Sequence, residues 1–189
     1  MTNKDLEIFR DIPTLYTPRL ILRKIDARDI DDIFEYARDK RVSDFLLWDP
    51  HKDRTFTTRF VENIERGYKE LKYFTWGVEY QGKMIGTCGF SVFDIPNNSA
   101  QVGYVLSADY WNMGIASEAT KRVIEYGFDT LELSKIEARF IKENVHSQRV
   151  AEKCGMTYYL TVPRAYTHRT GKRDMGICYI NRETFLKNK

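Results

Sequence analysis

The stretch YVLSADYWNMGIASEATKRVIEYGF, from Tyr104 to Phe128, passes from a strand-like pattern to an amphipathic helix that we expect from about Ser117 to Thr130. Small residues, Gly114 and Ala116, stand at the junction, in a chain that has only 11 glycines in 189 residues. The first turn of a helix has unpaired N–H groups and the positive end of the helix dipole. The junction is therefore either a plain connection or an anion site.

Two common phosphate-binding motifs are absent from this stretch. No Gly-Lys-Ser/Thr follows Gly114, so the lysine and the magnesium-binding hydroxyl of a P-loop are missing. The G-x-G-x-x-G pattern of dinucleotide-binding folds is missing as well. If the junction binds an anion, the remaining possibility is a diphosphate held mainly by backbone amides, without a metal ion.

Over the whole chain, the periodicity predicts one mixed α/β domain over residues 1–189, built around a single sheet. The order is β-α-α-β-β-β-α-β-α-β-β, with Asp29 capping the first helix and Gln81-Gly82-Lys83 forming a tight hairpin. The other predicted strands cover 19–26, 73–80, 84–94, 101–107, 135–141, 156–166 and 173–181, and the other helices cover 57–71 and 144–155.

The composition favours a cytoplasmic globular protein. A net charge of +3 is too balanced for a nucleic-acid surface, and no apolar run approaches the ~20 residues of a membrane span. The N-terminus has no signal-peptide core, and three cysteines favour free thiols over a disulfide framework. No C-x-x-C or H-x-x-x-H spacing indicates a metal site, so we expect neither a metal nor a catalytic Cys-His pair.

Three segments carry a resemblance to a known family. QVGYVLSADYWNMGIASEA resembles the acyl-CoA pyrophosphate motif of the GNAT superfamily of acetyltransferases, in the subgroup similar to ribosomal-protein N-terminal (Rim-type) enzymes, although Asn112 replaces the usual glycine. ENVHSQRVAEKCGM resembles the family's Asn-x-x-Ser helix motif, and the segment from Arg164 to Phe185 resembles its C-terminal hairpin. The resemblance covers roughly residues 17 to 185.

The resemblance implies a GNAT-like fold whose central sheet splays open, with acetyl-CoA as co-substrate. The catalytic groups it implies are Ser147 as a hydrogen-bond donor to the leaving thiolate, Asn144, and a backbone amide near Leu106. Asn144 and Ser147 also suit a helix cap, and both roles can hold together. The cofactor-binding residues that it implies are Val105, Leu106, Met113, Gly114, Ile115, Ala116, Ser117, Asn144, Ser147, Val150 and Lys153.

The general base and the acceptor are the open points. Gln101 stands where the subgroup often has glutamate, and an amide cannot accept the proton. Glu79 and Asp94 are candidates, but each suits an ordinary surface carboxylate, so the base stays unassigned. Candidates for lining the acceptor site are Phe45, Trp48, Gln101 and Tyr166.

The leading acceptor is a peptide or protein N-terminal α-amine, attacking acetyl-CoA directly in a ternary complex. The alternatives are a small-molecule amine (an amino acid, a polyamine or an antibiotic) and a non-catalytic acyl-CoA-binding domain. We expect neither a membrane nor a nucleic acid as partner, and a homodimer stays open.

Overall fold

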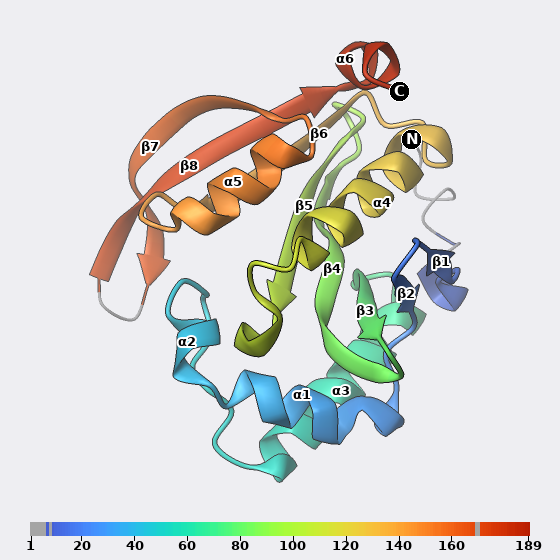
Figure 1. The fold of residues 1–189 in the computed structure, drawn as a ribbon, viewed down its shortest axis with the longest axis vertical. Helices are drawn as coiled ribbons and strands as arrows, with labels where there is room; N and C mark the ends of the chain where they lie inside the picture. The colour runs from blue at the N-terminus through green and yellow to red at the C-terminus, as the bar shows by residue number, and fades with distance from the viewer. Residues whose placement is uncertain (1–6, 8, 169–170) are drawn as a thin grey trace.

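The computed structural model describes residues 7, 9–168 and 171–189, and within them the strands form one sheet in the order β1-β2-β3-β4-β5-β6-β8-β7 (Figure 1). The strands are β1 (Leu15–Tyr16), β2 (Leu20–Arg23), β3 (Phe74–Tyr80), β4 (Lys83–Asp94), β5 (Ser99–Leu106), β6 (Lys135–Ile141), β7 (Thr157–His168) and β8 (Gly171–Asn181). The α-helices are α1 (Ile30–Ala37), α2 (Lys40–Ser43), α3 (Arg54–Lys69), α4 (Ile115–Asp129), α5 (Val145–Lys153) and α6 (Arg182–Lys187), with 3-10 turns at Ala27–Asp29 and Ala108–Tyr110.

The sheet opens between β5 and β6, its only parallel pair in the described part of the chain. The two strands pair only from Ser99–Lys135 to Val102–Ala138. Beyond that point β5 stays with β4 as far as Leu106, and β6 stays with β8 as far as Ile141. This divergence is the splay that the sequence resemblance predicts, and it leaves one edge of β5 unpaired.

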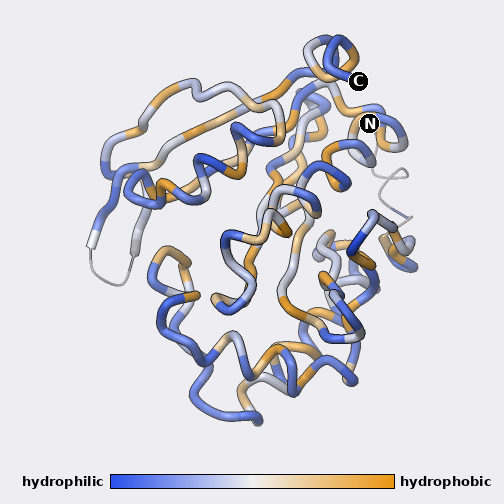
Figure 2. The backbone as a smooth tube through the Cα atoms, viewed as in Figure 1, coloured by the Kyte–Doolittle hydropathy of each residue, from blue (hydrophilic) through white to orange (hydrophobic). Residues whose placement is uncertain are grey.

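The core packs where α4 crosses β4, β5 and β6. In Figure 1, α4 lies across the near face of the sheet, and α3 lies behind β3. Gly127 brings the α4 backbone close to the sheet, because a Cβ atom there would lie 2.8 Å from Ile136 Cδ1 and 2.9 Å from Phe90 Cζ. Figure 2 shows hydrophobic segments along the central strands and hydrophilic ones toward the tip of the β7–β8 hairpin. No helix of the described residues has the length and apolar character that crossing a membrane requires.

The hairpin predicted at Gln81-Gly82-Lys83 is present. β3 ends at Tyr80 and β4 begins at Lys83, which leaves a two-residue turn with φ values of 52° for Gln81 and 80° for Gly82. Positive φ at both central residues is the geometry of a type I′ turn, whose twist matches that of the paired strands.

The N-terminal ends of three helices differ from the sequence prediction. The helix α4 begins at Ile115 rather than near Ser117, with Gly114 as its N-cap. The helix α3 begins at Arg54 rather than residue 57, because the Asp53 side chain accepts a hydrogen bond from Phe56 N–H. The Asp29 side chain does not cap α1. It is 2% exposed and accepts hydrogen bonds from the Arg23 guanidinium and from Asp26 N–H. The prediction failed there because Arg23, on a separate strand, offers a stronger charged partner than the helix end does.

The segment between α1 and α3 is irregular, as predicted, except for the short helix α2. It is held by His51, which is 6% exposed and whose Nδ1 lies 2.9 Å from the Thr57 hydroxyl. The rings of Trp48, Phe56 and Phe60 surround the imidazole at centroid distances of 4.8–5.5 Å. Burial lowers the pKa of His51, so the folded protein favours its neutral form.

A pH dependence of stability follows from this burial. The unfolded chain binds a proton at His51 more readily than the folded protein does, because the imidazole has its ordinary pKa of ~6.5 only in the unfolded chain. The stability that neutral His51 confers is therefore present above that pH and is lost as the pH falls below it. We expect the stability advantage of the wild type over His51→Gln to shrink between pH 7 and pH 5, measured by urea unfolding. A constant difference across this range would show that His51 titrates alike in both states.

Candidate active site

The unpaired edge of β5 presents backbone groups to the opening. Ser107 N–H donates to the Ile85 carbonyl of β4 over 2.8 Å. Because successive residues of a strand direct their polar groups to opposite sides, the N–H and C=O of Leu106 and Tyr104 face the opening, whereas those of Val105 face β4. If acetyl-CoA contacts the backbone of this strand end, it therefore does so at Leu106 and Tyr104. Val105, a predicted cofactor-binding residue, reaches the opening through its side chain.

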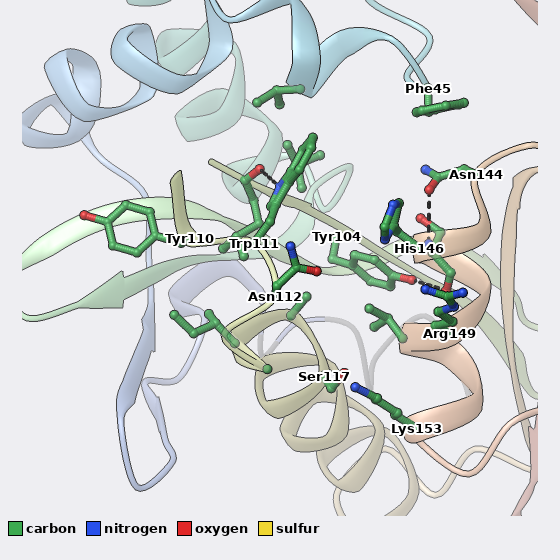
Figure 3. A pocket seen from close by; sticks show the side chains of 18 of the residues that line it. Phe45, Tyr104, Tyr110, Trp111, Asn112, Ser117, Asn144, His146, Arg149 and Lys153 are labelled. Atoms are coloured by element: carbon green, nitrogen blue, oxygen red, sulfur yellow. Dashed lines mark hydrogen bonds between the residues drawn. The ribbon is translucent and has the colours of Figure 1, made fainter. Parts of the chain in front are cut away.

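Trp111 fixes the end of this edge. Its indole Nε1–H donates to the Leu106 carbonyl over 2.9 Å. Figure 3 shows its ring opposite His146, and both side chains line the cavity described next. With the carbonyl occupied, the Leu106 N–H is the polar group that this residue offers to a ligand. A backbone N–H at a strand edge is suited to an oxyanion, since its dipole presents a partial positive charge in a fixed direction.

A first cavity, of about 380 Å³, lies between this edge and the N-terminal ends of α4 and α5. At α4, Gly114 is the N-cap with φ 76°, and no side chain caps the helix. The first intrahelical bond runs from Glu118 N–H to the Gly114 carbonyl, so the amides of the first turn, from Ile115 to Ser117, have no helical partner. Such a turn binds an anion through its amides and its dipole.

The loop before α4 is held in place by Arg19, the residue that precedes β2. The Arg19 guanidinium pairs with Glu118 over 2.7 Å and donates to the Met113 carbonyl over 3.0 Å. Met113, a predicted cofactor residue, is not among the described residues that line the cavity. The Met113 carbonyl instead accepts the hydrogen bond that holds the loop to Arg19. The other predicted cofactor-binding residues line the cavity: Val105, Leu106, Gly114, Ile115, Ala116, Ser117, Asn144, Ser147, Val150 and Lys153.

The helix α5 supplies the facing wall. Asn144 Oδ1 accepts from Ser147 N–H over 3.1 Å, so the capping role is present. The Tyr104 hydroxyl donates to the Ser147 carbonyl over 2.8 Å, and burial raises the pKa of Tyr104, which keeps the phenol protonated as that donor. The bond from Tyr104 ties the first turn of α5 to β5, and the bond to Asn144 closes that turn; Figure 3 shows Tyr104 and Asn144 at this end of α5.

Cationic groups gather around the first cavity. Arg149 and Lys153 lie one helical turn apart on α5, and Figure 3 shows Lys153 directed toward Ser117 at the start of α4. Arg41, from α2, lines the cavity as well. Sequence reasoning missed Arg41 and Arg149. The spacing of Arg149 four residues before Lys153 could have indicated Arg149, since it puts both side chains on one face of the helix. No sequence pattern indicated Arg41, which lies in the largely irregular segment between α1 and α3.

A second cavity, of about 590 Å³, adjoins the first. Gln101 and Tyr166, two of the predicted acceptor-site residues, line it, and Phe45 lines both. Trp48 lines neither, because its ring packs against His51 at 5.5 Å instead. The residues common to both cavities are Phe45, Leu46, Tyr104, Val105, Asn144 and Ser147.

The two carboxylates considered as bases are used elsewhere. Glu79 pairs with Arg23 over 2.5 Å, and Asp94 accepts hydrogen bonds from the backbone and side chain of Asn97 in the β4–β5 turn. Among the described residues that line the two cavities, none is Asp or Glu. A proton leaving the acceptor would therefore have to pass to water or to a neutral group.

The three thiols are structural. Cys88, Cys154 and Cys178 are buried, and burial raises the pKa of Cys88 and of Cys154 to about 12 and that of Cys178 to about 11. At neutral pH they are protonated and poorly nucleophilic. Within the described part of the chain, no group of three or more His, Cys, Asp and Glu side chains is placed to hold a metal ion.

Comparisons with known proteins agree with this geometry. Residues 19–157 match the family model described as an acetyltransferase (GNAT) domain. The "Uncharacterized N-acetyltransferase p20" of Bacillus licheniformis is 37% identical over 136 residues, which cover 71% of this chain and 76% of that protein. The crystal structure of a GNAT-family acetyltransferase from Bacillus anthracis has a TM-score of 0.81 at 25% identity, over 90% of this chain and 99% of that one.

A third likeness concerns the fold alone. RimL, titled a ribosomal L7/L12 α-N-protein acetyltransferase in complex with coenzyme A, has a TM-score of 0.80 at 17% identity, over 91% of this chain and 99% of that chain. The predicted family and fold are thereby confirmed. The chain belongs to the GNAT family of acetyltransferases and is an N-acetyltransferase that uses acetyl-CoA as its co-substrate.

Proposed function

We propose that the protein acetylates the α-amine of a peptide or protein N-terminus by direct attack on acetyl-CoA in a ternary complex. The observation that carries this proposal is the pair of adjoining cavities, which share the residues from Ser147 to the edge of β5. Two ligands held on either side of one strand edge can react without a covalent enzyme intermediate. Such positioning supplies up to ~7–11 kcal/mol of the barrier reduction in favourable cases.

In this proposal the first cavity takes acetyl-CoA. The amides from Gly114 to Ser117 bind the diphosphate, aided by Arg149 and Lys153, and the open edge of β5 pairs with the pantetheine arm. The Leu106 N–H stabilises the negative charge that develops on the thioester oxygen. The Ser147 hydroxyl donates a hydrogen bond to the departing thiolate, and Asn144 holds the helix turn that positions it.

The charges of the second cavity support a peptide α-amine over polycationic small molecules. Arg139 lines this cavity with its guanidinium paired to Glu137 over 2.8 Å, and no described lining residue is acidic. A polyamine or an aminoglycoside carries several positive charges, for which these walls offer no carboxylate as a partner. A peptide N-terminus has one amine and a neutral main chain. RimL, which shares the fold, is titled an α-N-protein acetyltransferase, and that agrees with this choice of acceptor.

The activity test compares acceptors of different charge. Purified protein should first show stabilisation by acetyl-CoA, since a ligand at ~100 times its Kd adds about 2.7 kcal/mol. We then expect thiol release to be faster with neutral peptides that have a free N-terminus than with spermidine or an aminoglycoside at equal concentration. Preference for the polycations would overturn the peptide assignment, and stabilisation without turnover on any amine would favour a non-catalytic binder.

The pH dependence of kcat/KM should reflect the pKa of the acceptor amine rather than that of an enzyme group. With no lining carboxylate to take the proton, the amine must arrive neutral, so kcat/KM should rise with pH up to the pKa of the acceptor, near ~8 for an α-amine. For a peptide with a blocked N-terminus and one lysine, the rise should continue toward ~10.4. A rise that ends at the same pH for both peptides would instead identify an enzyme group as the base.

A further inference from the structure

Gly103, in the middle of β5, has no structural need to be glycine. Its backbone conformation is an ordinary one for a strand, and a Cβ atom built there meets nothing within 4 Å. Two glycines of the neighbouring strand β4 differ. A Cβ at Gly86 would lie 2.2 Å from the Val105 carbonyl oxygen, and one at Gly89 would lie 2.3 Å from Thr75 Cα. Close backbone approach explains those two glycines but not Gly103.

The place of Gly103 suggests what the missing side chain leaves room for. It is the first residue of β5 beyond the last pair with β6, at the point where the sheet opens. It lines the second cavity and is absent from the lining of the first. Its partner across β4 is Gly89, which lines the same cavity but whose own Cβ position is blocked by Thr75, so the bare main chain lies at Gly103. A glycine inside a strand weakens it and often marks a place where a ligand approaches the backbone.

The walls around the main chain at Gly103 are larger side chains. Gln101 and Val105 stand on either side of Gly103 along the same face of β5, and Phe45 and Tyr166 line the same cavity from the α2 segment and from β7. A ligand that enters between these walls can lie directly on the main chain at Gly103. The amine of that ligand would then be next to Tyr104 and Ser147, which line both cavities.

We propose that Gly103 is the floor of the acceptor site and determines how large the group beside the reacting amine can be. This inference rests on the proposed function, since it takes the acceptor to be a peptide N-terminus. The first residue of the peptide lies flat over the main chain at Gly103. Any side chain at residue 103 narrows the space for that first residue without reaching the acetyl-CoA cavity.

The experiment uses Gly103→Ala and Gly103→Val, assayed with peptides that differ only in their first residue, from glycine to leucine. We expect Gly103→Val to lower kcat/KM about tenfold for an N-terminal glycine and a hundredfold or more for leucine, with Gly103→Ala intermediate. Stabilisation by acetyl-CoA should stay at the wild-type level, because residue 103 does not line the first cavity. Both variants should fold, since the added atoms enter open space.

The matched control is Val92→Leu, which adds one carbon on β4 at a residue that pairs with Gln101 and lines neither cavity. It should leave the rates with all peptides unchanged. If Gly103→Val acetylates every peptide at the wild-type rate, or loses the same factor with each, the inference about Gly103 is wrong. A wild-type protein that binds acetyl-CoA but acetylates none of the peptides would instead overturn the proposed function.

Discussion

Replacement of Ser117 by aspartate is expected to weaken acetyl-CoA binding about a hundredfold without destabilising the protein. Ser117 is the third residue of α4, and its N–H is one of the first-turn amides that have no helical partner. A carboxylate there interacts favourably with the helix dipole, by about 0.3–1 kcal/mol. Stability and binding should therefore change in opposite directions, which separates a binding defect from a folding defect.

The expected loss of affinity comes from charge. Two like charges 4 Å apart repel by about 4 kcal/mol at an effective dielectric constant of about 20, and a hundredfold change in Kd corresponds to about 2.8 kcal/mol. The new carboxylate would also compete with the diphosphate for the same amides. We would measure Kd for acetyl-CoA by calorimetry at two ionic strengths, with the deficit smaller at high salt.

The control is Ser117→Asn, which has nearly the shape of aspartate without the charge. It should bind acetyl-CoA with a Kd within about threefold of the wild-type value. The uncharged side chain changes only the local shape, and we expect the effect of that change on Kd to be well below tenfold. Equal affinity of Ser117→Asp and Ser117→Asn would show that the diphosphate is not held at the start of α4. The proposed roles of the first-turn amides, Arg149 and Lys153 would then have to be abandoned together.

What could be predicted from the sequence was mostly local. The junction at Gly114 and the hairpin at Gln81-Gly82 each depend on the conformational preferences of adjacent residues, and both are present in the structure. The splay between β5 and β6 was predicted too, but only through the resemblance to a family. Periodicity alone shows which residues form strands, and it does not show where two strands stop pairing.

The failures involve side-chain contacts that periodicity does not encode, some of them between residues distant in the chain. Glu79 was a candidate base until the structure placed it against Arg23, 56 residues away. Trp48 was expected in the acceptor site and instead packs against His51, and Arg41 reaches the acetyl-CoA cavity from a segment without periodicity. Gly103 was visible only as part of a motif. The open space above it depends on β6 turning away, which no local pattern encodes.

Replacement of Arg23 by alanine is expected to cost the largest amount of stability of any change considered for this protein. The Arg23 guanidinium holds Asp29 through bonds of 2.7 and 3.0 Å and Glu79 through one of 2.5 Å. Asp29 is 2% exposed, so its carboxylate cannot turn to water when Arg23 is removed. Leaving a buried charge without its partner costs about 3–5 kcal/mol. For a domain of this size, that lowers Tm by roughly 6 to 20 °C.

The charge argument can be separated from simple loss of packing by a second substitution. Asp29→Asn removes the buried charge and keeps the shape, so the double variant Arg23→Ala/Asp29→Asn should be more stable than Arg23→Ala alone. Arg28→Ala is the matched control, because Arg28 is 79% exposed and its ion pair with Asp26 is screened by solvent. We expect its Tm to match the wild type. If Arg23→Ala has the same Tm as Arg28→Ala, or if Asp29→Asn lowers the Tm of Arg23→Ala further, charge pairing does not hold the network around Asp29. The other contacts of α1 with the sheet, such as the bond from Met84 N–H to Asp32, would then hold the helix in place.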